Sequence, residues 1–143
     1  MNKPYPPVSE LLPHKAPMIL IDEILELTET AVRSRVLLTD QSPFVEDGAV
    51  PSLVSIEYMA QSIAAFAGAT RREKGEAVIR GYLIACREMT MAVESLAVGD
   101  ELEVVATQVW HDEKLGNFDC SVTRRGETVS RAWLSVYQGD LEL

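Results

Sequence analysis

The chain has 143 residues, of which 47% are hydrophobic and 24% are charged, a composition typical of a globular protein. Its 13 Lys and Arg against 22 Asp and Glu give a formal net charge of −9, which argues against nucleic acid or an anionic membrane as a partner. The apolar stretches are too short to cross a membrane, and the first residues lack the apolar segment of a signal peptide. We therefore expect a cytoplasmic protein.

The chain is interpreted as one domain, residues 1–143, because no linker, repeat or low-complexity tract divides it. Residues 1–13 are expected to form an N-terminal arm with one helical turn that Pro13 ends. The apolar run that begins at Met18 predicts a first strand. The alternation of apolar and charged residues in 31–39 predicts a second strand.

A long helix is predicted from Ser52 to about Lys74, because apolar residues recur there at steps of three and four. Ser52 and Ser55 are available to cap its start, and Gly75 is suited to end it. Many of its residues are Ala, Ser or Gly, a composition that lets a curved sheet approach the helix backbone closely.

Only strands are predicted after this helix. They are expected as a meander of four, in residues 78–86, 101–110, 118–123 and 128–138, with a turn at 96–100 and a polar hairpin loop that contains His111. Gly81 is expected to mark a bulge or a close approach in the first of these strands. Strands that follow one another without intervening helices indicate an α+β fold with an antiparallel sheet.

The two cysteines, Cys86 and Cys120, both lie in apolar segments and are interpreted as buried core residues. Neither lies at metal-ligand spacing from another Cys or a His. We therefore predict no metal site and no cofactor.

Three stretches of the sequence form a recognisable pattern. The first is Leu11 to Asp22, which reads Leu-Leu-Pro-His-Lys-Ala-Pro-Met-Ile-Leu-Ile-Asp; the others are Ser42-Pro43-Phe44 with Pro51, Glu57 and Met59-Ala60-Gln61, and Val98-Gly99-Asp100-Glu101-Leu102. Together they resemble the β-hydroxyacyl-acyl carrier protein dehydratases of fatty acid synthesis, over essentially the whole chain. Within that family the chain is most similar to the divergent dehydratase-like proteins of aryl polyene gene clusters. The resemblance implies a hot-dog fold, an α+β module in which a curved antiparallel sheet wraps a long central helix.

The resemblance also implies a reaction, the removal of water from a 3-hydroxyacyl thioester carried by an acyl carrier protein. In the family a His takes the proton α to the thioester carbonyl and a Glu on the helix protonates the departing hydroxyl. Glu57 matches that Glu, and Gln61, one turn further, is placed to orient its carboxylate. Where the family has Gly-His-Phe-Pro before the helix, this chain has residues 46–51, Glu-Asp-Gly-Ala-Val-Pro, without a His.

Three hypotheses address the missing base. His14 substitutes for it, although a structural role fits the position of His14 in the family better. Alternatively, Asp47 acts as the base in the vacated loop, although a carboxylate is a weak base at pH 7 unless it is buried. In the third hypothesis the subunit supplies Glu57 to an active site that a His-bearing hot-dog paralogue completes, in a heterodimer rather than a homodimer.

The remaining expectations concern substrate and function. Gln61, Pro51, Ser52 and Tyr58 are expected at the substrate-binding site, since a helix N-terminus can polarise a thioester carbonyl. Tyr58, Phe66 and Tyr82 are candidates to line an acyl tunnel, although core packing explains them as well. The alternatives to a dehydratase are a thioesterase with a carboxylate base and a non-catalytic subunit that stabilises an active partner.

Overall fold

The structure, a computed structural model, describes residues 5–139. Its elements follow the order strand, strand, helix, strands that the sequence predicts. In chain order they are α1 (Val8–Leu11), β1 (Glu23–Leu27), β2 (Ala31–Leu37), β3 (Ala49–Pro51), the 3₁₀ turn η1 (Ser52–Val54), α2 (Ser55–Glu73), β4 (Gly81–Met91), β5 (Ser95–Ala97), β6 (Glu101–His111), β7 (Leu115–Arg124) and β8 (Glu127–Gln138).

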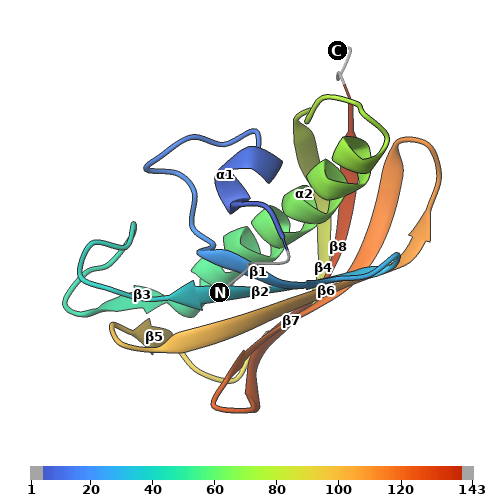
Figure 1. Cartoon of the computed structure of the whole chain (residues 1–143). Coiled ribbons are helices and arrows are strands. Elements are labelled where there is room, and N and C mark those ends of the chain that lie inside the picture. Colours follow the sequence, from blue (N-terminus) through green and yellow to red (C-terminus); the bar gives the residue numbers. More distant parts are fainter. Residues whose placement is uncertain (1–4, 140–143) are drawn as a thin grey trace.

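A six-stranded antiparallel sheet in the order β1-β2-β6-β7-β8-β4 dominates the structure. The sheet curves, and α2 lies along its concave face while α1 packs on the other side of the helix (Figure 1). A separate pair, β3 with β5, lies near the start of α2. The expected α+β architecture, with a long helix wrapped by a curved antiparallel sheet, is confirmed.

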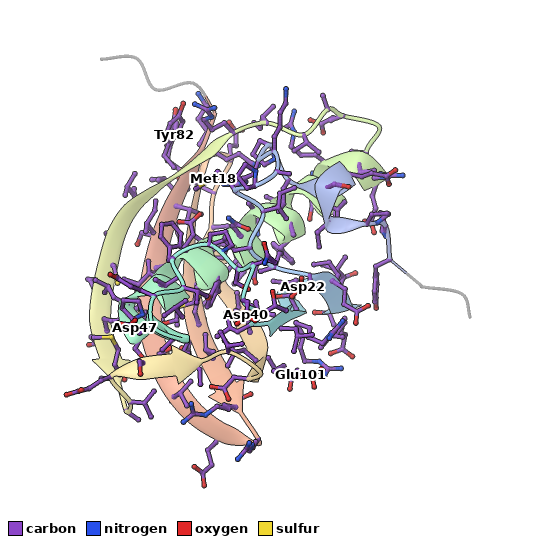
Figure 2. The ribbon with its side chains drawn as sticks, turned by 90° about the vertical axis from the view of Figure 1, so that its left-hand side faces the viewer. Met18, Asp22, Asp40, Asp47, Tyr82 and Glu101 are labelled. Atoms are coloured by element: carbon purple, nitrogen blue, oxygen red, sulfur yellow. The ribbon has the colours of Figure 1, made fainter. Side chains whose placement is uncertain are left out.

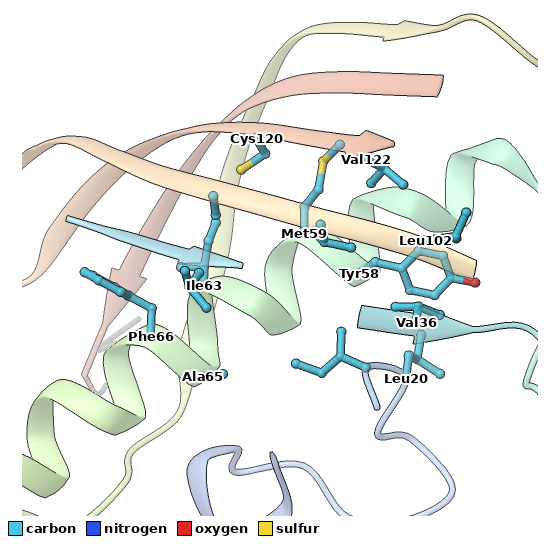
Figure 3. Packing of buried hydrophobic residues seen from close by; sticks show 14 of the residues in the cluster. Leu20, Val36, Tyr58, Met59, Ile63, Ala65, Phe66, Leu102, Cys120 and Val122 are labelled. Carbon is cyan, nitrogen blue, oxygen red and sulfur yellow. The ribbon is translucent and has the colours of Figure 1, made fainter. Parts of the chain in front are cut away.

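The core lies between α2 and the concave face of the sheet (Figure 3). Alternate residues of β6, namely Leu102, Val104 and Ala106, are fully buried, as the period of two in a strand requires. On the helix side, Phe66 meets Phe118 of β7 edge to face, with ring centroids 5.9 Å apart. This burial is the main stabilising term, at roughly 1.5–3 kcal/mol for each large apolar side chain.

The small residues of α2 permit the close approaches that the sequence suggests. At Gly68 any side chain would collide with the backbone carbonyl of Leu11, so the glycine allows α1 to pack directly on the helix. On the sheet side, the hydroxyls of Ser62 and Ser34 are 2.6 Å apart, and Ser62 also donates to the carbonyl of Tyr58. The helix is thus buried on two sides.

Several details of the strand predictions are wrong. The segment from Met18 to Asp22 precedes β1 rather than forming part of it, and β3 and β5 were expected as a loop and a turn. The four-strand meander is also incorrect, because β4 pairs with β8 and only β6, β7 and β8 are consecutive hairpin neighbours. The chain after β4 passes through β5 to reach β6, so neighbours in sequence are separated in the sheet.

Three residue-level expectations also fail. Cys86 is exposed, because β4 is an edge strand, whereas Cys120 is buried as expected. Gly81 starts β4, and the irregularities of that strand lie between Leu83 and Ala85 and between Arg87 and Thr90. Neither Ser52 nor Ser55 caps the helix: Ser55 Oγ instead donates to the carbonyl of Ser52 at 2.7 Å.

Candidate functional site

Glu57 lies in the first turn of α2 with a side chain that is 42% exposed. Its carboxylate Oε1 accepts a hydrogen bond of 3.1 Å from Nε2 of Gln61, one turn further along the helix. A carboxylate in the first turn also interacts favourably with the helix dipole. Glu57 is therefore held in place by one neighbour while one side remains open to a substrate or another protein.

Gln61 is fully buried and is fixed at both ends of its amide. Nε2 donates 2.7 Å to the carbonyl of Met18 in addition to Glu57, and Oε1 accepts 2.7 Å from the N–H of Leu20. The segment that precedes β1 is thus tied to α2, because its backbone is hydrogen-bonded to the side chain of Gln61. Sequence reasoning missed these two partners. Each bond joins the Gln61 side chain to a backbone group more than 40 positions away, and the backbone groups of Met18 and Leu20 leave no signature in residue type.

His14 lies beside the same carboxylate, with Nε2 4.0 Å from Glu57 Oε1. The other ring nitrogen, Nδ1, is buried and has no hydrogen-bond partner within residues 5–139. The Nε2 side of the ring therefore faces the carboxylate of Glu57, and the Nδ1 side faces the interior. His14, Glu57 and Gln61 therefore form one cluster.

The start of the helix has a different character. Ser52 is buried, its N–H donates to the carbonyl of Glu94 at 2.9 Å, and its hydroxyl has no partner in the described part of the chain. Pro51 is exposed and contributes no N–H. The N–H of Ser52 is thus already hydrogen-bonded. No side chain caps the N-terminus of η1 or of α2.

Asp47 lies apart from this cluster, in an exposed turn near β5 (Figure 2). Its φ of 54° and the φ of 78° at Gly48 place both residues in the left-handed region, as expected for a tight Asp-Gly turn. Nothing in this position buries the carboxylate, and burial is what a carboxylate needs to become a base at neutral pH.

Tyr58 belongs to the buried core. The residue is 2% exposed, and its ring lies between Leu102 and Val36 (Figure 3). Burial, with a smaller contribution from the charge of Asp22, raises the pKa of Tyr58 to about 12. Of the other two tunnel candidates, Phe66 belongs to the core, and Tyr82 lies on β4 outside the core cluster.

Chemically, the cluster offers one partly exposed carboxyl with an imidazole and an amide beside it. Glu57 is a partly exposed carboxyl at a helix N-terminus, which suits proton transfer to a leaving hydroxyl. The loop before the helix holds no His. Within residues 5–139, no group of three or more His, Cys, Asp or Glu side chains is placed to hold a metal ion, and no helix has the length and apolar character of a membrane span.

Comparison with solved structures identifies the class of the fold. Residues of this chain superpose on "The Dehydratase Heterocomplex ApeI:P from Xenorhabdus doucetiae" with a TM-score of 0.91 and 32% sequence identity, over 95% of this chain and 93% of that one. Similarity of fold alone extends to a hypothetical thioesterase protein from Streptococcus pneumoniae TIGR4 (TM-score 0.64, 12% identity, 85% and 88% coverage) and to the Escherichia coli PaaI protein (0.62, 14%, 80% and 81%). The expected hot-dog fold is confirmed.

The family follows from a second comparison. A family model described as ApeP dehydratase, of the ApeP-like group, matches residues 6–143. The chain therefore belongs to the ApeP-like dehydratases, which agrees with the resemblance carried by the Leu11–Asp22 and Glu57–Gln61 stretches. The Xenorhabdus relative is a heterocomplex, a dehydratase built from two different chains.

Proposed function

We propose that this chain is one subunit of a 3-hydroxyacyl thioester dehydratase, to which it supplies Glu57, and that a His-bearing hot-dog paralogue supplies the general base. The observation that carries the proposal is the combination of an ordered Glu57–Gln61 pair with a preceding loop that lacks the His. The family assignment and the heterocomplex of the Xenorhabdus relative support it.

In the proposed reaction the partner's His takes a proton from C2 of the 3-hydroxyacyl thioester. The electrons of that C–H bond form the C2–C3 double bond as the C3–O bond breaks. The Glu57 carboxyl, in its protonated form, gives its proton to the departing hydroxyl, which leaves as water. The products are a 2-enoyl thioester and water, so atoms and charge balance once the His returns its proton to Glu57 through solvent.

The side of the molecule that carries β4 is the proposed docking surface for the paralogue. β4 is the last strand of the sheet and exposes Leu83, Ile84 and Met91. A long edge strand with exposed apolar side chains is suited to pair with a strand of another chain. A heterodimer through this edge would extend the sheet and is favoured here over a homodimer, because two copies of this chain would still lack the base.

His14 is proposed as a positioning residue rather than the base. Its Nε2 faces Glu57 at 4.0 Å and its Nδ1 is buried, which suits contact with the carboxyl better than attack on a substrate carbon. Together with Gln61 it would fix the carboxyl relative to the substrate. Pro51 and Ser52 are proposed to border the thioester, and Asp47 is left as an exposed turn residue.

The substrate is proposed to be carried by an acyl carrier protein in a cytoplasmic pathway of the fatty acid type. The two cysteines are free, which suits a reducing compartment. The strongly acidic chain would need a local basic surface to meet an acidic carrier, or would leave that contact to the partner.

The decisive experiment reconstitutes the chain with a His-bearing hot-dog paralogue and measures enoyl thioester formation from a 3-hydroxyacyl thioester. Glu57→Gln is expected to reduce the rate of the pair by roughly 10²–10⁴-fold, the usual effect of losing a positioned acid. Glu73→Gln, an exposed carboxylate at the other end of α2, is the matched control and should leave the rate unchanged.

Three other outcomes would replace the proposal. Full activity of the chain alone would exclude the need for a partner's base. Release of free thiol without enoyl product would identify a thioesterase with a carboxylate base. An active pair that is indifferent to Glu57→Gln would make the chain a stabilising subunit without a catalytic group.

A further inference from the structure

Four of the buried serines in residues 5–139 lie in two pairs between α2 and the sheet. Ser34 of β2 meets Ser62 of α2, with the hydroxyl oxygens 2.6 Å apart, and Ser130 of β8 meets Ser55 of α2 at 2.9 Å. Each of the four is at most 2% exposed. A buried hydroxyl without a partner would be destabilising, so each pair satisfies groups that water cannot reach. The helix is thus joined to the sheet by hydroxyls as well as by apolar contacts.

The hydrogen bonds of each pair have a fixed direction. Ser62 donates its one hydroxyl hydrogen to the carbonyl of Tyr58 at 2.9 Å, so the hydrogen between the two oxygens comes from Ser34. In the same way Ser130 donates to Ser55, whose own hydrogen goes to the carbonyl three residues before it, at 2.7 Å. Both hydroxyl chains therefore run from a strand, through a helix hydroxyl, to a backbone carbonyl nearer the start of the helix.

The two hydroxyl chains hold α2 at two separate points. β2 and β8 are separated in the sheet by β6 and β7, and Ser55 and Ser62 are about two turns, or ~10 Å, apart along the helix. Apolar contacts have no preferred direction, whereas a hydrogen bond has a preferred distance and angle. One such bond would let the helix pivot about it. Two bonds to different strands fix both the rotation of the helix and its position along its axis.

The Ser130 chain also lies next to the proposed docking edge. Ser130 is the ladder partner of Met91 on β4, and it reaches Ser55, which lies two residues before Glu57. Only one ladder pair and one hydroxyl contact therefore separate β4 from the first turn of α2. The position of the Glu57 carboxyl relative to a subunit paired at β4 depends on this connection.

We propose that Ser130 and Ser34 are positioning residues, whose hydroxyls set the register of α2 on the sheet and so place Glu57 for proton transfer to the departing hydroxyl. Neither serine touches the substrate, because each acts through the helix. The proposal deepens the proposed function and rests on it, since it takes Glu57 as the acid. A misplacement of about 1 Å can reduce a rate on the order of a hundredfold, so the loss of one of the two chains is expected to lower kcat about tenfold.

The first test measures enoyl thioester formation by the chain reconstituted with the His-bearing paralogue. Ser130→Ala is expected to lower kcat about tenfold and to leave KM within about twofold, because the substrate contacts remain while the acid is misplaced. Ser34→Ala, on the other strand, should behave alike. Ser135→Ala is the matched control on β8: its hydroxyl donates to Oδ1 of Asn117 at 2.7 Å and not to the helix, so kcat should be unchanged.

The second test shows whether Ser130 acts through Ser55. If it does, Ser130→Ala lowers kcat only where Ser55 is present, and the double variant is no slower than Ser55→Ala alone. Two effects that multiply, or an equal loss of kcat in Ser135→Ala, would mean that the substitutions act by general destabilisation and would overturn the proposal. Unchanged kcat in both Ser130→Ala and Ser34→Ala would also overturn it.

The third test needs neither partner nor substrate. Gln61 binds the N–H of Leu20, so the side-chain amide signals of Gln61 in the ¹⁵N-labelled chain report how α2 lies against the segment before β1. Ser130→Ala should shift these signals, whereas Ser135→Ala should not. Shifted signals together with no dehydration by any reconstituted pair would refute the proposed function and leave the hydroxyls as the groups that hold the helix. Unshifted signals in an active pair would refute the role of the hydroxyls alone.

Discussion

The two edges of the main sheet are built in opposite ways. The β1 edge is five residues long, and charged side chains cross it in rows: Arg35 of β2 lies between Glu23 of β1 and Glu101 of β6, and Arg33 pairs with Glu26 and Glu103. The β4 edge is eleven residues long and exposes apolar side chains. The β1 edge is short and crossed by ion pairs, whereas β4 is long and exposes three large apolar side chains beside its two charged residues, Arg87 and Glu88.

This difference teaches where the chain is complete and where it is not. Short length and charge are the usual ways in which proteins prevent an edge strand from pairing with another molecule. They are stronger on β1 than on the longer β4, which agrees with the proposal that β4 meets another subunit. Under the proposed function, the site without a His base and the open β4 edge would both be completed by the same partner.

The largest effect is expected from a charge introduced on β4. Ile84→Asp places a charge on the apolar edge and is expected to weaken association with the His-bearing paralogue on the order of a hundredfold, as the loss of a central interface side chain does. Val109→Asp, at a similarly exposed valine of β6, is the control. Light scattering and titration of the two subunits measure the effect. Unchanged association in Ile84→Asp would place the interface elsewhere.

The second prediction uses the exposed cysteine of the same strand. Cys86 of the free chain should react readily with a thiol reagent, whereas burial raises the pKa of the Cys120 thiol to about 12 and keeps it inert. Addition of the paralogue should slow the labelling of Cys86 by about tenfold or more, in proportion to the fraction bound. Mass spectrometry of the labelled chain follows both residues. Equal labelling with and without a saturating partner would contradict pairing through β4.

The third prediction concerns Asp100, in the turn between β5 and β6. Burial opposes ionisation of Asp100, but the N–H of Ala97 and the Arg124 guanidinium together lower its pKa below the ordinary value. Its contribution to the free energy of unfolding is therefore present above about pH 4 and is lost as the pH falls further.

Asp100→Asn should lower the free energy of unfolding by about 1–2 kcal/mol at pH 7, with little difference at pH 2. Urea denaturation at the two pH values measures this, and the same loss at both would show that the charge of Asp100 is not involved. Association with the partner should be unaffected, in contrast with Ile84→Asp.

The smallest effect is expected at the charged edge itself. Arg35→Gln removes the centre of one ion-pair row, whose members are partly exposed, so the free energy of unfolding should fall by only about 0.5–1 kcal/mol. The loss should shrink at high salt. Because the pKa of Arg35 is raised from an already high value, its stabilisation stays constant between pH 6 and pH 9. A loss above 2 kcal/mol would mean that this row is structural rather than protective.

Much of the fold could be predicted from local pattern, as particular residues show. The three- and four-residue spacing of Ile56, Met59 and Ile63 defined α2, and the alternation through Phe118, Cys120 and Val122 defined β7. Pairing was less accessible, because an apolar run such as 81–86 has the same composition in a buried strand as in an edge strand that waits for a partner. That is why Cys86 was expected in the core.

The candidate site divides in the same way. Glu57 and Gln61 were predictable because they lie four residues apart on one helix, so their contact is local. The position of His14 beside Glu57, and the bonds of Gln61 to the backbone of Met18 and Leu20, depend on how a distant segment packs on the helix. The exposed position of Asp47 likewise follows from the turn that the chain adopts there.

By itself the sequence determined the long helix, the alternating strands, the family and the absence of a His before Glu57. These are properties of residue type and short spacing. Only the tertiary structure decided which strand became the open edge, that Tyr58 lies in the core rather than beside the Glu57 carboxylate, and that His14 joins that carboxylate. The physical reason is that each of these depends on contacts between segments far apart in the chain, and such contacts are fixed by packing around α2.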